Sequence, residues 1–279
     1  MRNLTRAAVC ILSTTAMVVA ASEAPAATAQ TTAICTDIVV VGVHGTGEGP
    51  NTVDTSAYSP TLRAVESGAK SVLDSAGVGY DLAGVVYDAP RVDNLGAFFA
   101  YKVDTLIAVN AINQRLGGYK GCPSPPDVVL AGYSLGAWSV LEWLREQKTL
   151  SKHGAANYLK QVKGVVLFGD PQVNRKEKLD PPGVTVTYKG LAQYTPWAIK
   201  GSYPPKVLPN GIEIHSWCAM LDPICGVGYT PPVIDISSPQ VQDAINCSEG
   251  NGCTHMKYAS EGGPAKDAGK WLAEQTLQK

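Results

Sequence analysis

A serine flanked by glycines is the residue of this sequence best suited to act as a nucleophile. Residues 132–136, GYSLG, match the pattern G-x-S-x-G with Ser134 at the centre. The apolar run 128–131 before it predicts a strand, and the residues from Ala137 onward predict a helix. A sharp turn from strand to helix holds such a serine in a strained conformation with its hydroxyl exposed. The chemistry that this pattern indicates is attack by Ser134 on a carbonyl carbon.

Four histidines are candidates for the base that such a serine needs. In α/β-hydrolase chains the catalytic residues follow the order serine, acid, histidine, which disfavours His44 because it precedes Ser134. His153 lies one predicted helix past the serine and is read as exposed. His215 lies in a predicted strand, ahead of the best acid candidate. His255 lies in the loop before the last predicted helix and fits the order, so we expect it to be the base.

Two aspartates are candidates for the acid that orients this base. Asp222 lies in the segment 218–225, which has a cysteine at each end, and a disulfide across the segment would fix the direction of its carboxylate. Asp170 follows a predicted strand, at the end of the sheet where the sites of open α/β proteins gather, but it also reads as a turn residue before proline. We expect Asp222 to orient His255, with Asp170 as the alternative.

Two segments are expected to supply the N–H groups that stabilise a developing oxyanion. One is the backbone of Leu135, the residue after the serine. The other is the loop 44–49, HGTGEG, whose glycines allow amides to turn inward. This loop lacks the lysine and the spacing of the phosphate-binding pattern G-x-x-x-x-G-K-[ST], so we do not expect it to bind a nucleotide.

Residues 1–29 have the organisation of a secretory signal. Two arginines precede the apolar run 7–21, and the small residues APAATA follow it. The run is shorter than the ~20 apolar residues of a membrane span, so we expect cleavage after Ala26 or Ala29 and no stable membrane insertion. Residues 30–279 show no internal repeat and no clear linker, and we expect them to form one domain.

Six of the seven cysteines lie outside this signal, and an even number favours disulfides in an oxidising compartment. Close spacing favours two pairs, Cys218 with Cys225 and Cys247 with Cys253, which leaves Cys35 and Cys122, although the sequence alone does not choose among the possible pairings. The cysteines form no C-x-x-C pair and no histidine cluster accompanies them, so we expect no metal.

Composition excludes two classes of protein. The 23 basic and 24 acidic residues give a net charge of -1, which argues against nucleic-acid binding. Hydrophobic residues make up 45% of the 279 residues, too many for a disordered chain. The region 171–253 is rich in glycine and proline, and we read it as long loops with strands at 184–188 and 212–217. Loops of such length in a compact domain are usually functional.

Apolar runs alternate with helix-like stretches along the rest of the chain. The runs predict strands at 37–43, 84–87, 127–132 and 162–169. The helix-like stretches are 61–75, 95–116, 135–147 and 264–277. Together with the GYSLG turn, this alternation predicts an α/β-hydrolase fold with a mainly parallel central sheet and helices on both faces, a three-layer sandwich.

These motifs, taken in order, resemble the cutinase family of secreted α/β-hydrolase esterases, which have no large lid. The resemblance runs from about Cys35 to the C-terminus. Its most specific part is a cysteine twelve residues before Ser134, then C-x3-D-x2-C at 218–225, then H-x2-Y at 255–258. In that family the acid lies between two paired cysteines, as Asp222 does here.

The resemblance also implies two features that the residues alone leave open. It joins Cys35 to Cys122, and it assigns Thr46 to the oxyanion hole as a donor of both its N–H and its O–H. The chain departs from the family at Leu135, where glutamine is frequent, but a backbone N–H survives that change. It departs again in the gap between acid and histidine, which is long here and carries Cys247 and Cys253.

The sequence therefore predicts a secreted serine esterase that hydrolyses carboxylic esters through an acyl-enzyme, using Ser134, His255 and Asp222. No metal or organic cofactor is expected. The expected substrate is a cutin-like polyester, an acylglycerol or another acyl ester, and the protein is expected to be an extracellular or cell-wall-associated monomer. The alternatives are a lipase or mycolyl-ester hydrolase acting on long acyl chains, and a non-catalytic cell-wall or antigenic protein on the same fold.

Overall fold

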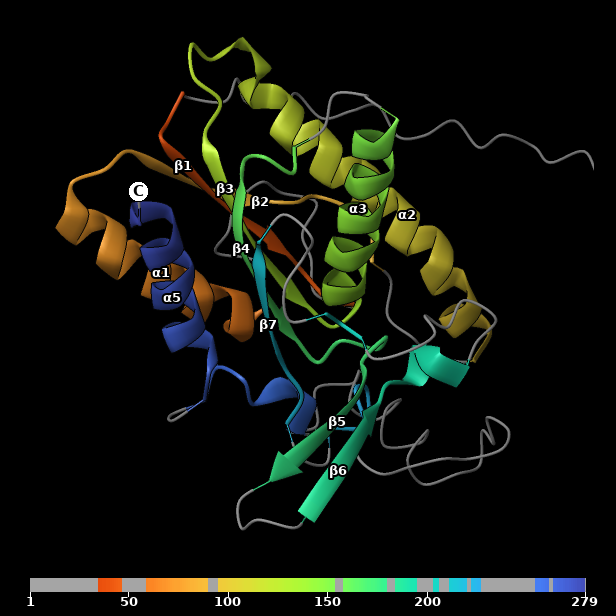
Figure 1. The fold of residues 1–279 in the computed structure, drawn as a ribbon. Helices are drawn as coiled ribbons and strands as arrows, with labels where there is room; N and C mark the ends of the chain where they lie inside the picture. Colours follow the sequence, from red (N-terminus) through yellow and green to blue (C-terminus); the bar gives the residue numbers. More distant parts are fainter. Residues whose placement is uncertain are drawn as a thin grey trace, which may run out of the picture. The chain divides into compact units, whose positions relative to one another are not determined.

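Five parallel strands form the central sheet, in the order β2-β1-β3-β4-β7 (Figure 1). They span Tyr80–Gly84 (β2), Ile38–Val43 (β1), Asp127–Tyr133 (β3), Val162–Phe168 (β4) and Glu213–Trp217 (β7). The computed structural model describes residues 35–46, 59–89, 95–153, 158–179, 184–194, 203–205, 211–219, 222–226, 254–260 and 263–278. All of these residues belong to one compact unit, Ala33–Lys279.

Helices cover both faces of this sheet (Figure 1). On one face lie α1 (Pro60–Ala76) and α5 (Ala265–Leu277), and on the other lie α2 (Leu95–Gly117) and α3 (Leu135–Lys152). Short 3-10 helices occur at Gly118–Gly121 (η2), Leu191–Tyr194 (η3) and Thr254–Met256 (η4). The predicted α/β-hydrolase fold with its three layers is confirmed. Among the described residues, no helix combines the length and the apolar character that crossing a membrane requires.

The core is divided by the sheet because successive side chains of a strand point to opposite faces. In β1, Val39, Val41 and Val43 face the layer of α2 and α3. Ile38 and Val40 of the same strand face the layer of α1 and α5. Every residue of β1 is buried, which explains why its sequence is a continuous apolar run rather than an alternating one.

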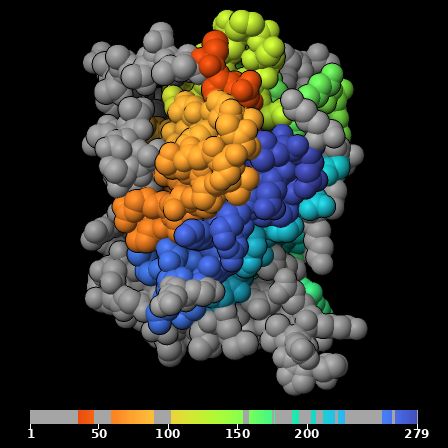
Figure 2. Space-filling view, turned by 90° about the vertical axis from the view of Figure 1, so that its left-hand side faces the viewer, coloured from red at the N-terminus to blue at the C-terminus, as the bar shows by residue number. Residues whose placement is uncertain are grey.

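Helices α1 and α5 lie side by side on one face of the molecule, drawn in orange and blue in Figure 2. A Cβ atom added to Gly269 of α5 would lie 1.9 Å from the carbonyl oxygen of Val65 in α1, so this close approach requires glycine. The contact fixes the start of α5. The segment just before α5 carries His255 and Tyr258, so the same contact limits where these side chains can lie.

The second strand differs from its predicted position. The sequence predicts a strand at 84–87, but β2 is Tyr80–Gly84 and residues 85–87 follow it as a loop in which Val85 and Tyr87 are buried. The true strand is less apolar than expected because it lies at the edge of the sheet, where Asp81 forms an ion pair with Arg115. The apolar character of the loop has another cause, since Tyr87 stacks on His44 with 4.3 Å between the ring centroids.

A separate antiparallel hairpin follows β4. It consists of β5 (Asn174–Leu179), which was not predicted, and β6 (Val184–Lys189), which matches the strand expected at 184–188. The residues of β5, NRKEKL, lack the apolar alternation of a half-buried strand. The strand expected at 212–217 is β7, which pairs in parallel with β4.

Candidate active site

Ser134 lies at the sharp turn between β3 and α3. Its backbone has φ 55° and ψ -121°, and it is the only described residue other than glycine with a positive φ. Its N–H donates to the carbonyl oxygen of Phe168 in the neighbouring strand at 2.8 Å, which stabilises the turn. The residue is 9% exposed. A strained conformation at this point is what the G-x-S-x-G pattern predicts for a nucleophilic serine.

The loop after β1 packs directly against this serine. A Cβ atom added to Gly45 would lie 2.9 Å from the Cβ atom of Ser134. Thr46 follows in the same loop and is partly buried, whereas the rest of the predicted oxyanion loop, 47–49, lies outside the described residues. Leu135 is the first residue of α3, so its N–H has no partner one turn earlier in the helix. Both segments proposed for the oxyanion hole therefore border Ser134.

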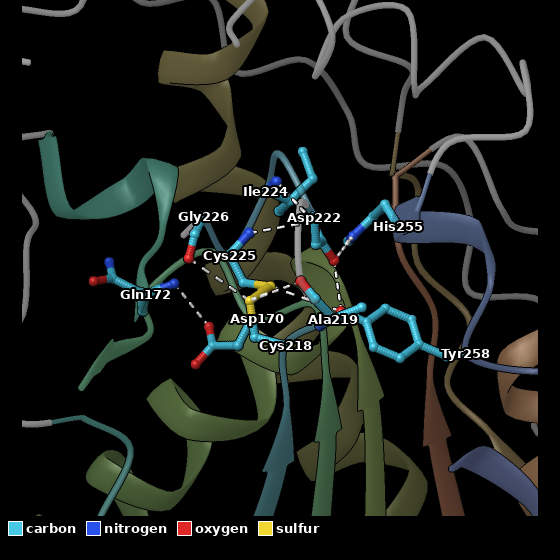
Figure 3. Close-up of a disulfide and its surroundings, with 10 residues drawn as sticks. All are labelled: Asp170, Gln172, Cys218, Ala219, Asp222, Ile224, Cys225, Gly226, His255 and Tyr258. Atoms are coloured by element: carbon cyan, nitrogen blue, oxygen red, sulfur yellow. Dashed lines mark hydrogen bonds and ion pairs between the residues drawn. A yellow bond between two sulfur atoms is a disulfide. The ribbon is translucent and has the colours of Figure 1, made fainter. Parts of the chain in front are cut away.

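His255 and Asp222 form a buried pair (Figure 3). The Nδ1 atom of His255 lies 2.8 Å from Oδ2 of Asp222, and the two residues are 5% and 1% exposed. An ionised carboxylate only accepts hydrogen bonds, so Nδ1 carries the proton and Nε2 is left as an acceptor. Nε2 is buried and has no hydrogen-bond partner within the described residues. The imidazole lies against Gly169, where an added Cβ atom would come within 2.3 Å of Cε1.

The Asp222 carboxylate is held by its own turn. Its Oδ1 atom accepts hydrogen bonds from the N–H groups of Ile224 at 2.7 Å and Cys225 at 3.3 Å. The Cys218–Cys225 disulfide closes the same turn. Burial of Asp222 opposes ionisation, but the adjacent His255 and the accepted hydrogen bonds outweigh it and hold the pKa of this carboxyl below its usual range.

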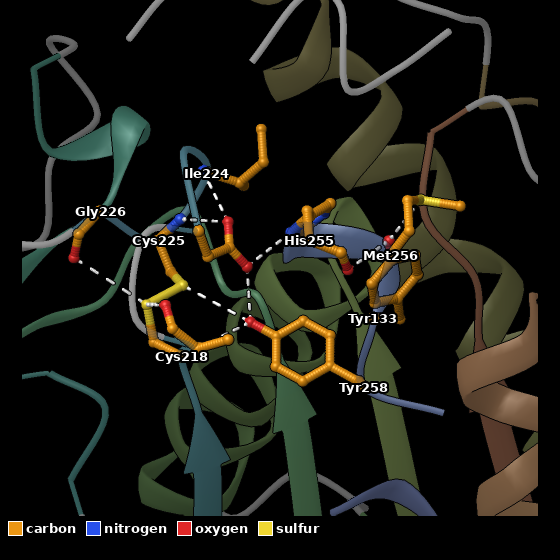
Figure 4. A network of polar contacts seen from close by, with 10 residues as sticks. Tyr133, Cys218, Ile224, Cys225, Gly226, His255, Met256 and Tyr258 are labelled. Atoms are coloured by element: carbon orange, nitrogen blue, oxygen red, sulfur yellow. Dashed lines mark hydrogen bonds and ion pairs between the residues drawn. A yellow bond between two sulfur atoms is a disulfide. The ribbon is translucent and has the colours of Figure 1, made fainter. Parts of the chain in front are cut away.

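Tyr133, the residue before the serine, connects the turn at Ser134 to the histidine (Figure 4). Its ring stacks on that of His255 with 4.9 Å between centroids, and its hydroxyl donates to the His255 carbonyl oxygen at 3.0 Å. No hydrogen bond joins the Ser134 hydroxyl to His255 within the described residues, and such contacts often form only when substrate is bound.

The other candidates of the sequence are engaged elsewhere. Asp170 is buried, and its Oδ1 atom accepts from the N–H of Gln172 at 2.8 Å. His215 stacks on Trp271 at 3.9 Å between centroids, on the surface of β7. His44 stacks on Tyr87 as described above, and burial lowers the pKa of its imidazole. His153 is an exposed residue at the end of α3.

Two disulfides lie within the described residues. The structure bonds Cys35 to Cys122 and Cys218 to Cys225, whereas Cys247 and Cys253 lie outside the described residues. The described residues contain no group of three or more histidine, cysteine, aspartate or glutamate side chains placed to hold a metal ion.

One residue of the site was not assigned a role from the sequence. Tyr258 is 2% exposed, and its hydroxyl donates to the Oδ2 atom of Asp222 at 2.5 Å (Figures 3 and 4). The available signal was its position three residues after His255, in the segment that resembles the cutinase family. That spacing marks a family pattern but does not reveal the contact with an aspartate 36 residues earlier.

A parallel sheet between helix layers, with a strained serine at the end of β3, defines the chain as an α/β-hydrolase. A family model described as Cutinase matches residues 34–276, so the chain belongs to the cutinase family and is a carboxylic ester hydrolase.

Solved structures that share this fold include the following two. A cutinase-like protein from Cryptococcus sp. is 18% identical, with 89% of this chain and 98% of that chain covered and a TM-score of 0.53. An acetyl xylan esterase is also 18% identical, with 87% of this chain and 100% of that chain covered and a TM-score of 0.50. No curated protein matches the chain in sequence.

Proposed function

We propose that this protein hydrolyses esters through an acyl-enzyme formed on Ser134, with His255 as the base and Asp222 as the acid that orients it. The observation that carries the proposal is the buried hydrogen bond of 2.8 Å between His255 Nδ1 and Asp222 Oδ2. This bond fixes the tautomer that leaves Nε2 able to take a proton. The hydrogen bond from the Tyr133 hydroxyl to the His255 carbonyl oxygen supports the same assignment, because it holds the histidine next to the turn at Ser134.

The reaction proceeds in two halves. Ser134 Oγ attacks the ester carbonyl while its proton passes to Nε2 of His255, and the N–H groups of Thr46 and Leu135 stabilise the oxyanion, with the Thr46 hydroxyl as a further donor. The proton then passes from Nε2 to the leaving alcohol, which leaves an acyl group on Ser134. In the second half, water gives a proton to Nε2 as its oxygen attacks the acyl carbonyl. Nε2 then returns that proton to Ser134 Oγ as the acyl–Oγ bond breaks, which releases the acid and restores the serine. Asp222 stays ionised throughout and stabilises the imidazolium.

A partition experiment tests the acyl-enzyme. Butyryl esters of p-nitrophenol, phenol and umbelliferone are hydrolysed in the presence of a fixed concentration of methanol, and methyl butyrate and butyric acid are quantified. Because all three esters pass through the same acyl group on Ser134, we expect one common ratio of methyl ester to acid. A ratio that changes with the leaving group would mean that water attacks the ester directly, and it would contradict the proposal.

Export to an oxidising compartment is part of the proposal. The signal-like residues 1–29 support it, and so do the two disulfides, because disulfides persist mainly outside the cytoplasm. The mature protein would then be a single domain of residues 30–279. The mass of the exported chain is expected to correspond to cleavage after Ala26 or Ala29. An exported chain that retains residues 1–26 would show that this segment is not a cleaved signal.

A further inference from the structure

The Tyr258 hydroxyl lies among the polar contacts around Asp222 (Figure 3). It accepts a hydrogen bond from the N–H of Ala219 at 3.1 Å and lies 3.7 Å from Sγ of Cys225. Because one lone pair is used by Ala219 and the Asp222 carboxylate can only accept, the phenol proton points at Oδ2 of Asp222. The direction of this hydrogen bond therefore follows from its neighbours.

Asp222 is consequently held at both oxygen atoms. The N–H groups of Ile224 and Cys225 hold Oδ1, and Tyr258 shares Oδ2 with His255. Burial, together with the negative charge of Asp222, raises the pKa of the Tyr258 phenol well above its usual value, so the phenol keeps its proton around neutral pH. The second donor on Oδ2 withdraws negative charge from the oxygen atom that faces the imidazole.

We infer that Tyr258 is a positioning residue, which aims Oδ2 of Asp222 at Nδ1 of His255 and sets how much negative charge the imidazole meets. This inference rests on the proposed function. It assigns to Tyr258 a role that a residue filling space in the core would not have, because the phenyl ring and the hydroxyl act differently. The ring packs against Phe168 with 5.5 Å between centroids, whereas the hydroxyl acts on the carboxylate.

The pH dependence of activity reports this role because few other titratable groups contact His255. Among the described residues, the ring and carbonyl of His255 meet Asp222, Tyr258 and Tyr133. Cys218 and Cys225 form a disulfide and do not titrate. A shift in the acid limb of the pH profile after a change at Tyr258 therefore reflects a change in the charge on Asp222.

The test compares two tyrosine-to-phenylalanine variants. Tyr258→Phe removes the donor to Asp222, and Tyr119→Phe is the matched control, since buried Tyr119 donates in the same way to Oδ2 of Asp81, which also pairs with Arg115 at 3.0 Å. Asp81 and Tyr119 lie near the amino ends of β2 and β3, at the opposite end of the sheet from Ser134. Each variant loses one hydrogen bond, buried for Tyr258 and part-buried for Tyr119, and is expected to melt at lower temperature.

The two variants are expected to differ in the position of the acid limb of the pH profile of kcat/KM. In Tyr258→Phe, negative charge concentrates on Oδ2 and favours the imidazolium, so the acid limb moves to higher pH by roughly half a unit and kcat falls about tenfold. In Tyr119→Phe the acid limb stays in place. Replacement of Tyr258 by 3-fluorotyrosine, which keeps the hydroxyl and strengthens it as a donor, is expected to move the acid limb to lower pH.

Equal acid limbs in wild type, Tyr258→Phe and the fluorinated protein would overturn the inference and leave Tyr258 a purely structural residue. A failure of the proposed function looks different. In that case the Ser134→Ala variant remains active or the methanol partition ratio varies with the leaving group, whatever the tyrosine variants do. If Tyr258→Phe does not fold, the fluorinated protein alone decides, because it retains both the ring and the hydroxyl.

Discussion

Replacement of Ser134 by alanine is expected to lower kcat for p-nitrophenyl butyrate by about 10⁶-fold, because the atom that we propose forms the acyl-enzyme is lost. The remaining activity should come from binding and the oxyanion hole alone. The fold should survive, because the Ser134 side chain makes no capping hydrogen bond to α3 and alanine adopts the same backbone region at a similar cost. Initial rates at saturating ester, with circular dichroism as a check of folding, measure the effect.

A second serine variant serves as the control for Ser134→Ala. Ser71 lies on α1, and its hydroxyl donates to the carbonyl oxygen of Gly68 at 2.6 Å, away from the site. Ser71→Ala likewise removes one serine hydroxyl, here from within α1, and is expected to leave kcat unchanged. If Ser134→Ala keeps activity comparable to that of Ser71→Ala, Ser134 is not the nucleophile.

Replacement of Asp222 by asparagine is expected to lower kcat by roughly 10³–10⁴-fold. Both oxygen atoms of the carboxylate act only as acceptors. Oδ1 accepts from Ile224 and Cys225, and Oδ2 accepts from His255 and Tyr258. An amide NH₂ group therefore meets donors in either orientation. With the NH₂ group at the position of Oδ2, the stable arrangement has Nδ1 of His255 accepting and Nε2 protonated, so Nε2 cannot take the serine proton.

The rival acid supplies the control for Asp222→Asn. Asp170 is also a buried aspartate, and it accepts from the N–H of Gln172 rather than from His255. Asp170→Asn is expected to lower stability but to keep kcat within about tenfold of wild type. Comparable losses of kcat in the two variants, at pH 8 and with both proteins folded, would show that Asp222 has no special role.

The positions of the candidate residues could be predicted because the signals are local or follow chain order. Ser134 is marked by a five-residue pattern, Asp222 by its two flanking cysteines, and His255 by its place after the acid. The hydrogen bond between Asp222 and His255 could not be read from the residues alone, because it depends on how two loops 33 residues apart meet. The contact of Tyr258 with Asp222 could not be predicted for the same reason, since only the folded chain brings its hydroxyl to that carboxylate.

The predicted strand positions differ from the structure where tertiary contacts outweigh the local sequence pattern. In the segment 85–87, Val85 and Tyr87 are buried and Tyr87 stacks on His44, so the apolar character comes from these contacts and not from a strand. The strand β2 looks polar because Asp81 is satisfied by an ion pair at the edge of the sheet. The strand β5 is rich in charged residues and is held by its pairing with β6. In each case a contact with a distant residue outweighs the local pattern.

Labelling with a fluorophosphonate tests the central claim, that Ser134 is an activated nucleophile, most directly. The reagent phosphonylates a serine only where a base takes its proton and donors stabilise the oxyanion. Intact mass spectrometry followed by peptide mapping should find one adduct per chain, located on Ser134 and formed at the rate at which esterase activity is lost. An unlabelled protein, or an adduct on another residue with activity lost in parallel, would contradict the assignment.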